Sequence, residues 1–141
     1  MAKRLFLSFV VLGCAGLVFW LWPNPSSQEG HVTIQIMDRG VLIREVEAEL
    51  FEDDVLFTVL ERHFNLVCAT PGYGSDLSCQ PRLIMGRTGG RVLLGIDGLE
   101  TDWFSYFLQI RLNGMPAQYG VDTLVLEDGD AVIIDRIAVN D

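Results

Sequence analysis

Hydrophobic and polar residues alternate in the part of the chain that follows residue 30. Val32, Ile34 and Ile36 occupy every second position, which is the period of a strand with one buried face. The turn sequence Asp38-Arg-Gly40 follows, and residues 41–48 have the composition of a returning strand. The pattern therefore predicts a β-hairpin at the start of the folded domain.

The hydrophobic period then changes to that of a helix. After the acidic sequence Glu52-Asp-Asp54, hydrophobic residues repeat at helical spacing, at Leu56, Leu60, Phe64 and Val67. The acidic residues offer side-chain caps and a negative first turn for this helix. We therefore expect a single amphipathic helix that runs as far as Val67.

Short hydrophobic runs separated by turn sequences fill the rest of the chain. They predict strands over residues 91–96, 103–112, 123–126 and 131–139, with turns at Asp97-Gly98, Asn113-Gly114 and Glu127-Asp-Gly-Asp130. One helix can bury its hydrophobic side against only one face of a sheet, so this order of elements predicts two layers. The expected fold class is α+β, with the layout of a β-grasp-like sheet and one packed helix.

A long uncharged segment precedes the hairpin. Residues 5–22 carry no charge, and as a helix they would span about 27 Å, enough to cross the hydrocarbon core of a membrane. Two tryptophans end this run where an aromatic belt is expected, and Lys3 and Arg4 precede it. Residues 1–22 are therefore predicted to be a single-pass transmembrane helix, with a cytoplasmic N-terminus and a periplasmic or extracellular domain.

Two other interpretations of the N-terminal segment remain open. A cleaved signal peptide has a similar basic start and hydrophobic stretch, and Val11-Leu-Gly-Cys14 resembles the box at which bacterial lipoproteins are lipidated. All three interpretations export the residues that follow. Residues 23–30 are rich in Pro, Ser and Gln and predict a short linker, so the folded domain should comprise residues 31–141.

The cysteines agree with an oxidising compartment. Cys68 and Cys79 flank a loop that contains Pro and Gly residues, and a disulfide between them is the simplest interpretation. Two buried thiols are the alternative. Two cysteines at this spacing, with no pair of histidines nearby, match no zinc pattern, so no metal is expected.

Charge argues against several classes of function. The chain has 19 Asp and Glu residues against 10 Lys and Arg, a net charge of −9, and the only lysine lies in the N-terminal segment. An acidic domain repels phosphate backbones, so we expect no nucleic-acid partner. The histidines, His31 and His63, fall on different predicted elements, and no motif of a catalytic nucleophile or a P-loop accompanies them. We therefore expect no enzymatic activity.

The C-terminal half shows a more specific order of motifs. These are the turn in Leu94-Gly-Ile-Asp-Gly-Leu99, the aromatic sequence Trp103-Phe-Ser-Tyr-Phe107, Asn113-Gly114, Gly120, and the turn in Leu126-Glu-Asp-Gly-Asp130. Their order resembles the transcobalamin-like C-terminal domain family, over roughly residues 31–139. The resemblance implies a β-grasp-like fold. In animal cobalamin carriers the corresponding domain covers one face of the corrinoid and a separate helical barrel covers the other, whereas similar bacterial domains are attached to cell-surface proteins.

Aromatic residues are the best candidates for a binding surface. Alternation places Trp103 on one face of the predicted strand and Phe104 and Tyr106 on the other, and Tyr119 and Gly120 follow. One face must belong to the core, and the other could form an apolar platform. We expect a membrane-tethered, non-catalytic module that docks an envelope protein. The alternatives are a small-ligand binder, with a corrinoid such as cobalamin as the ligand that the resemblance suggests, and a structural envelope protein without a ligand.

Overall fold

The structure is a computed structural model that describes residues 28–70, 72, 74–84, 87–102 and 104–139. The predicted transmembrane helix and most of the predicted linker lie outside these residues, so both stay predictions. Within the described part of the chain, no helix is long and apolar enough to cross a membrane.

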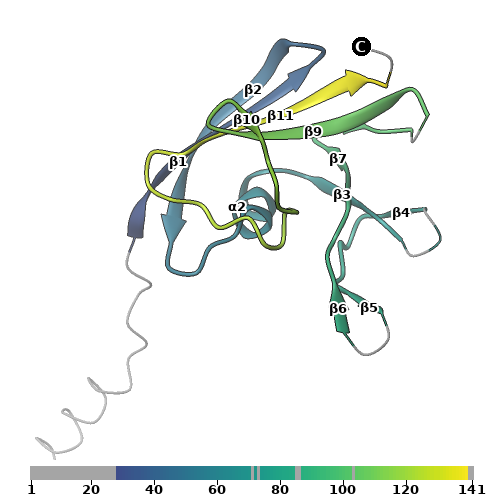
Figure 1. The fold of residues 1–141 in the computed structure, drawn as a ribbon, viewed down its shortest axis with the longest axis horizontal. Coiled ribbons are helices and arrows are strands. Elements are labelled where there is room, and N and C mark those ends of the chain that lie inside the picture. Colours follow the sequence, from purple (N-terminus) through teal and green to yellow (C-terminus); the bar gives the residue numbers. More distant parts are fainter. Residues whose placement is uncertain (1–27, 71, 73, 85–86, 103, 140–141) are drawn as a thin grey trace, which may run out of the picture.

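Five strands form the main sheet, in the order β10-β9-β11-β1-β2 (Figure 1). The predicted hairpin consists of β1 (Gln28–Asp38) and β2 (Val41–Phe51). β1 pairs in parallel with β11 (Ala131–Ala138), which pairs in antiparallel fashion with β9 (Tyr106–Leu112). The short β10 (Met115–Pro116) forms one edge of the sheet. The first and last long strands of the domain therefore lie side by side within the sheet.

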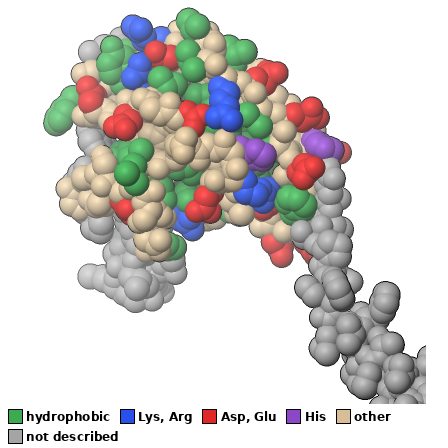
Figure 2. Space-filling view, turned by 180° about the vertical axis from the view of Figure 1, so that it is seen from behind, with side chains coloured by type: hydrophobic (Ala, Val, Ile, Leu, Met, Phe, Trp, Pro, Cys, Tyr) green, Lys and Arg blue, Asp and Glu red, His purple; other side chains and the backbone are tan. Residues whose placement is uncertain are grey.

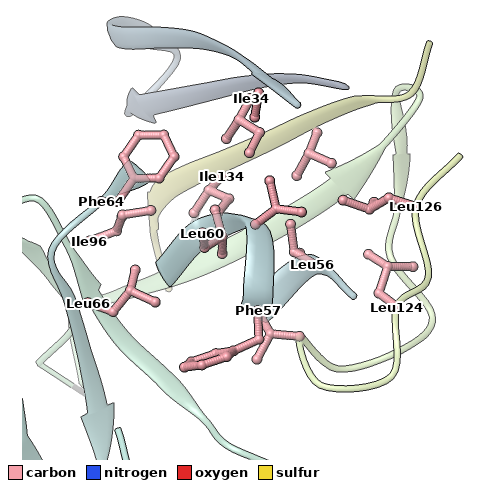
Figure 3. Close-up of a cluster of buried hydrophobic side chains, with 14 of the residues drawn as sticks. Ile34, Leu56, Phe57, Leu60, Phe64, Leu66, Ile96, Leu124, Leu126 and Ile134 are labelled. Atoms are coloured by element: carbon pink, nitrogen blue, oxygen red, sulfur yellow. The ribbon is translucent and has the colours of Figure 1, made fainter. Parts of the chain in front are cut away.

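The helix α2 (Leu56–His63) packs against one face of the main sheet (Figure 1). Figure 3 shows its hydrophobic side chains directed at those of the central strands and of the segment before β11. The side chains at the centre of this core are almost completely buried: Ile34, Ile36, Leu56, Val59, Leu60 and Ile134. Since burying one such side chain contributes roughly 1.5–3 kcal/mol, this layer is the main source of stability in the domain.

A second sheet has the order β4-β3-β7-β8. It is formed by β3 (Leu66–Ala69), β4 (Ser75–Asp76), β7 (Leu93–Ile96) and β8 (Leu99–Glu100). The expectation that a single sheet would contain all the strands was wrong, because β7 pairs with β3 rather than with a strand of the main sheet. The α+β class is confirmed, as two sheets with one short helix, beside the two-stranded ribbon of β5 (Arg82–Ile84) and β6 (Arg87–Gly89).

The end of the helix differs from the prediction. Helix α2 ends at His63, and Val67, which we expected inside the helix, belongs to β3. All four residues of β3 are buried. A short continuous apolar run of this kind is compatible with a helix or with a strand buried on both faces, and here long-range pairing with β7 decides the outcome.

The start of the helix also differs from the prediction. No side chain caps α2. Its first N–H groups instead donate to backbone carbonyls of a distant segment, Leu56 to Leu124 (2.8 Å) and Phe57 to Val121 (2.9 Å). This segment includes residues 123–126, which we expected to form a strand, but only a single bridge between Val55 and Val125 forms there.

Asp54 has a different role from the expected cap. Its carboxylate accepts hydrogen bonds from both terminal nitrogens of Arg62, at 2.9 and 2.6 Å, and from the backbone N–H of Phe51 at 2.9 Å. Burial opposes ionisation of this carboxyl, but the hydrogen bonds from Arg62 and Phe51 outweigh it, so the pKa of Asp54 is lowered. Asp54 therefore ties the helix to the end of β2.

The predicted disulfide between Cys68 and Cys79 is confirmed. Both cysteines are buried, and the bond joins β3 to the loop that follows β4. Because such bonds persist in oxidising compartments, the disulfide indicates that the domain lies outside the cytoplasm.

Candidate binding groove

An apolar groove of about 730 Å³ lies at the β10 edge of the main sheet. It is formed by the end of β9, by β10 and by the segment that follows, and its lining residues are Leu112, Met115, Pro116, Ala117, Gln118, Tyr119, Thr123, Leu124 and Val125. The rim is exposed to solvent: Met115 is 70% exposed, and Tyr119 and Val125 are each 65% exposed. A concave site of this size with mostly apolar walls is typical of binding sites for small molecules or for side chains of a partner.

The floor of the groove is held in place by backbone hydrogen bonds. Ala117 donates its N–H to the carbonyl of Ile110 on β9 (2.9 Å), and Leu124 donates to the carbonyl of Gly120 (3.0 Å), which closes a turn. The carbonyl of Leu124 in turn accepts the N–H of Leu56 at the start of α2. The groove is therefore preformed, with its floor anchored to both the sheet and the helix.

Two of the five predicted site residues lie at this groove. The ring of Tyr119 belongs to its lining, and the carbonyl of Gly120 organises the turn beneath it by accepting the N–H groups of Thr123 and Leu124. Gly120 itself does not line the groove.

The other predicted residues lie elsewhere. Phe104 and Tyr106 lie just before and at the start of β9, whereas Tyr119 follows β10, which pairs with the end of β9. Phe104 is 85% exposed. Trp103 lies outside the described residues. Of the described aromatic candidates, Tyr119 lines the groove and Phe104 and Tyr106 do not.

Tyr106 belongs to a polar cluster with Arg136 and Asp38 at one end of the main sheet. The guanidinium of Arg136 lies 5.2 Å from the centroid of the Tyr106 ring and donates to both carboxylate oxygens of Asp38, at 3.0 and 2.9 Å. Hydrogen bonding to Arg136 lowers the pKa of Asp38 and raises that of Arg136. Tyr106 is half-buried in these contacts, which favours a structural role for it.

The turn that carries Phe104 is shaped by Asp102. The Asp102 carboxylate accepts the backbone N–H groups of Ser105 (2.6 Å), Tyr106 (3.0 Å) and Phe104 (3.1 Å). These hydrogen bonds, that from Ser105 first, hold the pKa of Asp102 far below its ordinary value. Asp102 therefore fixes the turn that displays Phe104 to solvent.

Sequence analysis missed most of the groove. Leu112 was predicted as the last residue of a strand, residues 123–126 were predicted to form a strand of their own, and Met115 was not singled out. One signal was present, because Pro116 lacks a backbone N–H and restricts strand pairing at this position. A strand that stops there leaves Met115 at an unprotected edge.

The buried acidic residues have structural partners. Asp54 pairs with Arg62 (2.6 Å), and Asp135 lies 3.6 Å from Arg111. Over the described residues, no group of three or more His, Cys, Asp and Glu side chains is placed to hold a metal ion. Figure 2 shows the domain from behind, with acidic side chains on both sides of the view and basic ones among them.

Comparison with known proteins identifies the fold. No protein-family model matches the chain, and no curated protein matches it. Solved structures do match, and they show that the chain has the fold of a transcobalamin-like domain, as the motifs implied.

Two of the matched structures illustrate this likeness. One is a protein from Ruminococcus gnavus ATCC 29149 whose name proposes metal binding; it is 20% identical, with 78% of this chain and 98% of that chain covered and a TM-score of 0.53. The other is haptocorrin in complex with Cbi, which is 11% identical with a TM-score of 0.50. The match covers 81% of this chain but only 27% of the haptocorrin chain, in its C-terminal region. Neither protein is described as an enzyme.

Proposed function

We propose that this chain is a non-catalytic binding module, tethered to the outer side of a membrane by residues 5–22, whose groove receives an apolar group of an envelope protein. The main support for this proposal is the preformed groove with its exposed apolar rim. Because apolar surface in contact with water is unfavourable, we expect a partner to cover it. The disulfide between Cys68 and Cys79 supports an extracytoplasmic location.

The β-grasp-like classification is part of this proposal. It is supported by the parallel pairing of β1 with β11 within a mixed sheet, and by the single helix that packs across one face. In this arrangement Leu124 at the floor of the groove belongs to the core, whereas Met115, Tyr119 and Val125 at the rim are exposed, so a partner can contact the rim without disturbing the helix-covered face.

The rim of the groove suits a partner side chain. Met115 is flexible and polarisable, so it adapts to ligands of different shapes, and Tyr119 adds a large ring with a hydroxyl group. Because the floor is anchored by backbone hydrogen bonds, little ordering of the site is needed when a partner binds.

A crosslinking experiment tests the protein-docking proposal. Benzoylphenylalanine is introduced at Tyr119 of the full chain in membranes of the source organism. The matched control is Phe104, an exposed aromatic side chain that does not line the groove. We expect a discrete crosslinked protein from position 119 and none from position 104. Identical products from both positions, or no product from position 119, would contradict the proposal.

A small apolar ligand is the second candidate, and a corrinoid is the ligand class that the likeness to haptocorrin with bound Cbi favours. The groove volume of about 730 Å³ falls within the range of small-molecule sites. Binding at 100 times the dissociation constant would stabilise the folded chain by about 2.7 kcal/mol.

Thermal unfolding of the full chain in mild detergent, with and without 1 mM cyanocobalamin, measures this stabilisation. If the groove is the binding site, the ligand-induced shift in melting temperature should disappear in Tyr119→Ala and persist in Phe104→Ala. No shift in the parent chain would exclude the corrinoid and leave protein docking as the function of the groove.

A further inference from the structure

Strand β2 leaves a long edge of the main sheet open. It is eleven residues long and is the last strand in the order β10-β9-β11-β1-β2, with β1 as its only partner among the described strands. An open edge of this length is a template for pairing with another extended chain.

Hydrogen bonds in the sheet show which backbone groups of β2 face the open side. Thr33 on β1 donates its N–H to the β11 side, so its register partner on β2, Glu47, is not hydrogen-bonded to it. The N–H and carbonyl groups of Glu47, and by alternation those of Glu45, therefore point to the open edge. The carbonyl of Glu49 points the same way, but it accepts a hydrogen bond from Arg62 of α2 at 2.9 Å, so the part of the edge that is free to pair ends before Glu49.

The two faces of this edge differ in charge. Val46, Ala48 and Leu50 face the core, so Glu45, Glu47 and Glu49 form an acidic row on the sheet face opposite the helix. Glu45 accepts a hydrogen bond from Gln35 at 2.6 Å, and all three glutamates are exposed. On the helix side, Arg44 of β2 pairs with Asp97 and Arg62 of α2 pairs with Asp54, so that side carries balanced charges.

The hairpin end of β2 is hydrophobic. Val41, Leu42 and Ile43 are 63%, 51% and 56% exposed. A row of glutamates alone would be explained as protection of the edge against aggregation. Three consecutive exposed hydrophobic residues on the same edge weaken such protection, so a purely protective role does not account for the whole strand.

We propose that β2 is a docking edge for an extended basic segment of a partner protein, which adds a strand to the main sheet. Lysines or arginines at every second position of that segment lie over the acidic row, and a hydrophobic residue lies near Val41, Leu42 and Ile43. A second copy of this chain is disfavoured as the occupant, because pairing two β2 edges would bring two acidic rows together. This surface is separate from the groove, since β2 and β10 are opposite edges of the sheet, about 19 Å apart.

A labelled peptide tests the proposal without knowledge of the partner. The probe is a fluorescent ten-residue peptide in which lysines alternate with threonines before a C-terminal Val-Ile pair, so that it can pair with β2 in antiparallel fashion. Its binding to the full chain in mild detergent is followed by fluorescence anisotropy. Two control peptides have the same composition: one has contiguous lysines, and the other is N-methylated at each lysine, which blocks the backbone groups that would face β2. We expect the alternating peptide to bind at least tenfold more tightly than either control.

Variants of β2 separate backbone pairing from charge. Glu47→Pro removes an N–H that faces the open side and leaves the β1–β2 ladder intact, so we expect it to abolish binding, whereas the matched Glu47→Gln should weaken binding less than threefold. Replacing Glu45, Glu47 and Glu49 together by Gln should weaken binding about tenfold. Equal binding of all three peptides would show that charge alone attracts them. No binding of the alternating peptide at 1 mM would show that the edge is only protective. Either result overturns the proposal. If Glu47→Pro fails to fold, the N-methylated peptide gives the same comparison on the unaltered chain.

Discussion

Removing the disulfide between Cys68 and Cys79 should destabilise the domain by an amount that can be worked out from its loop. The two cysteines have a sequence separation of 11. On the chain-entropy model, closing a loop of this size raises the free energy of unfolding by about 2.8 kcal/mol at 25 °C. Since small domains are stable by only about 5–15 kcal/mol, this contribution is a large share of the total.

The experiment compares Cys68→Ala/Cys79→Ala with its parent in urea, following the far-ultraviolet circular dichroism of the full chain. Both chains carry Cys14→Ser, so that the only cysteines of the parent are the two that form the disulfide. We expect the midpoint of the variant to fall by roughly 1–2 M urea. A difference below about 1 kcal/mol would refute the loop-closure argument. Thiol labelling of Cys68 and Cys79 in the oxidised parent would refute the disulfide itself.

Three further changes test individual contacts. Asp54→Asn removes the charge of a buried carboxylate that pairs with Arg62, and we expect a loss of about 2–3 kcal/mol in urea denaturation, against almost none for the exposed neighbour in Glu52→Gln. The pKa of Asp102 lies far below its ordinary 3.8, so its carboxylate stabilises the folded state above about pH 4 and this contribution is lost as the pH falls further. The Asp102→Asn variant should therefore unfold at a lower temperature than the parent at pH 7, and this difference in melting temperature should shrink towards pH 2. A difference that stays constant with pH would contradict a stabilising role for the ionised Asp102. Gly30→Ala should lower the melting temperature, because its Cβ would lie 2.3 Å from a carboxylate oxygen of the turn before β11, with an expected cost of about 1–3 kcal/mol; an unchanged melting temperature would show that the turn can move.

The hairpin and the tight turns could be predicted from the sequence because both are local. Alternation at Val32, Ile34 and Ile36 defines one buried face, and a glycine follows a residue with positive φ in the turns Asp97-Gly98 and Asn113-Gly114. Glycine reaches positive φ at no steric cost, so these dipeptides signal turns regardless of the rest of the fold.

The division of strands between two sheets could not be predicted, because it depends on partners far apart in sequence. Leu66 pairs with Ile96 and Val67 with Gly95, and nothing in the hydrophobic run of β3 specifies a partner some thirty positions away. The end of α2 was misplaced for the same reason. Val67 fits a helical period equally well until its pairing with β7 is known.

The candidate site was predicted only in part. Tyr119 was predicted as a candidate binding residue, but the groove around it depends on the position of residues 117–125. That position is set by hydrogen bonds from Ala117 to β9 and from α2 to Val121 and Leu124. These bonds join backbone groups, and the identity of the side chains gives little information about them.

Helix α2 connects the two proposed binding surfaces, and this determines which variants can test them. At its start, Leu56 and Phe57 donate to carbonyls of the segment under the groove, and near its end Arg62 donates to the carbonyl of Glu49 on β2. A helix of eight residues is not stable alone in water, so its form depends on these contacts and on the core. A change that moves α2 would therefore disturb both surfaces at once. Substitutions of exposed side chains, such as those at Tyr119 and Glu47, leave these backbone contacts in place, so a loss of binding in only one assay can be assigned to the surface that was changed.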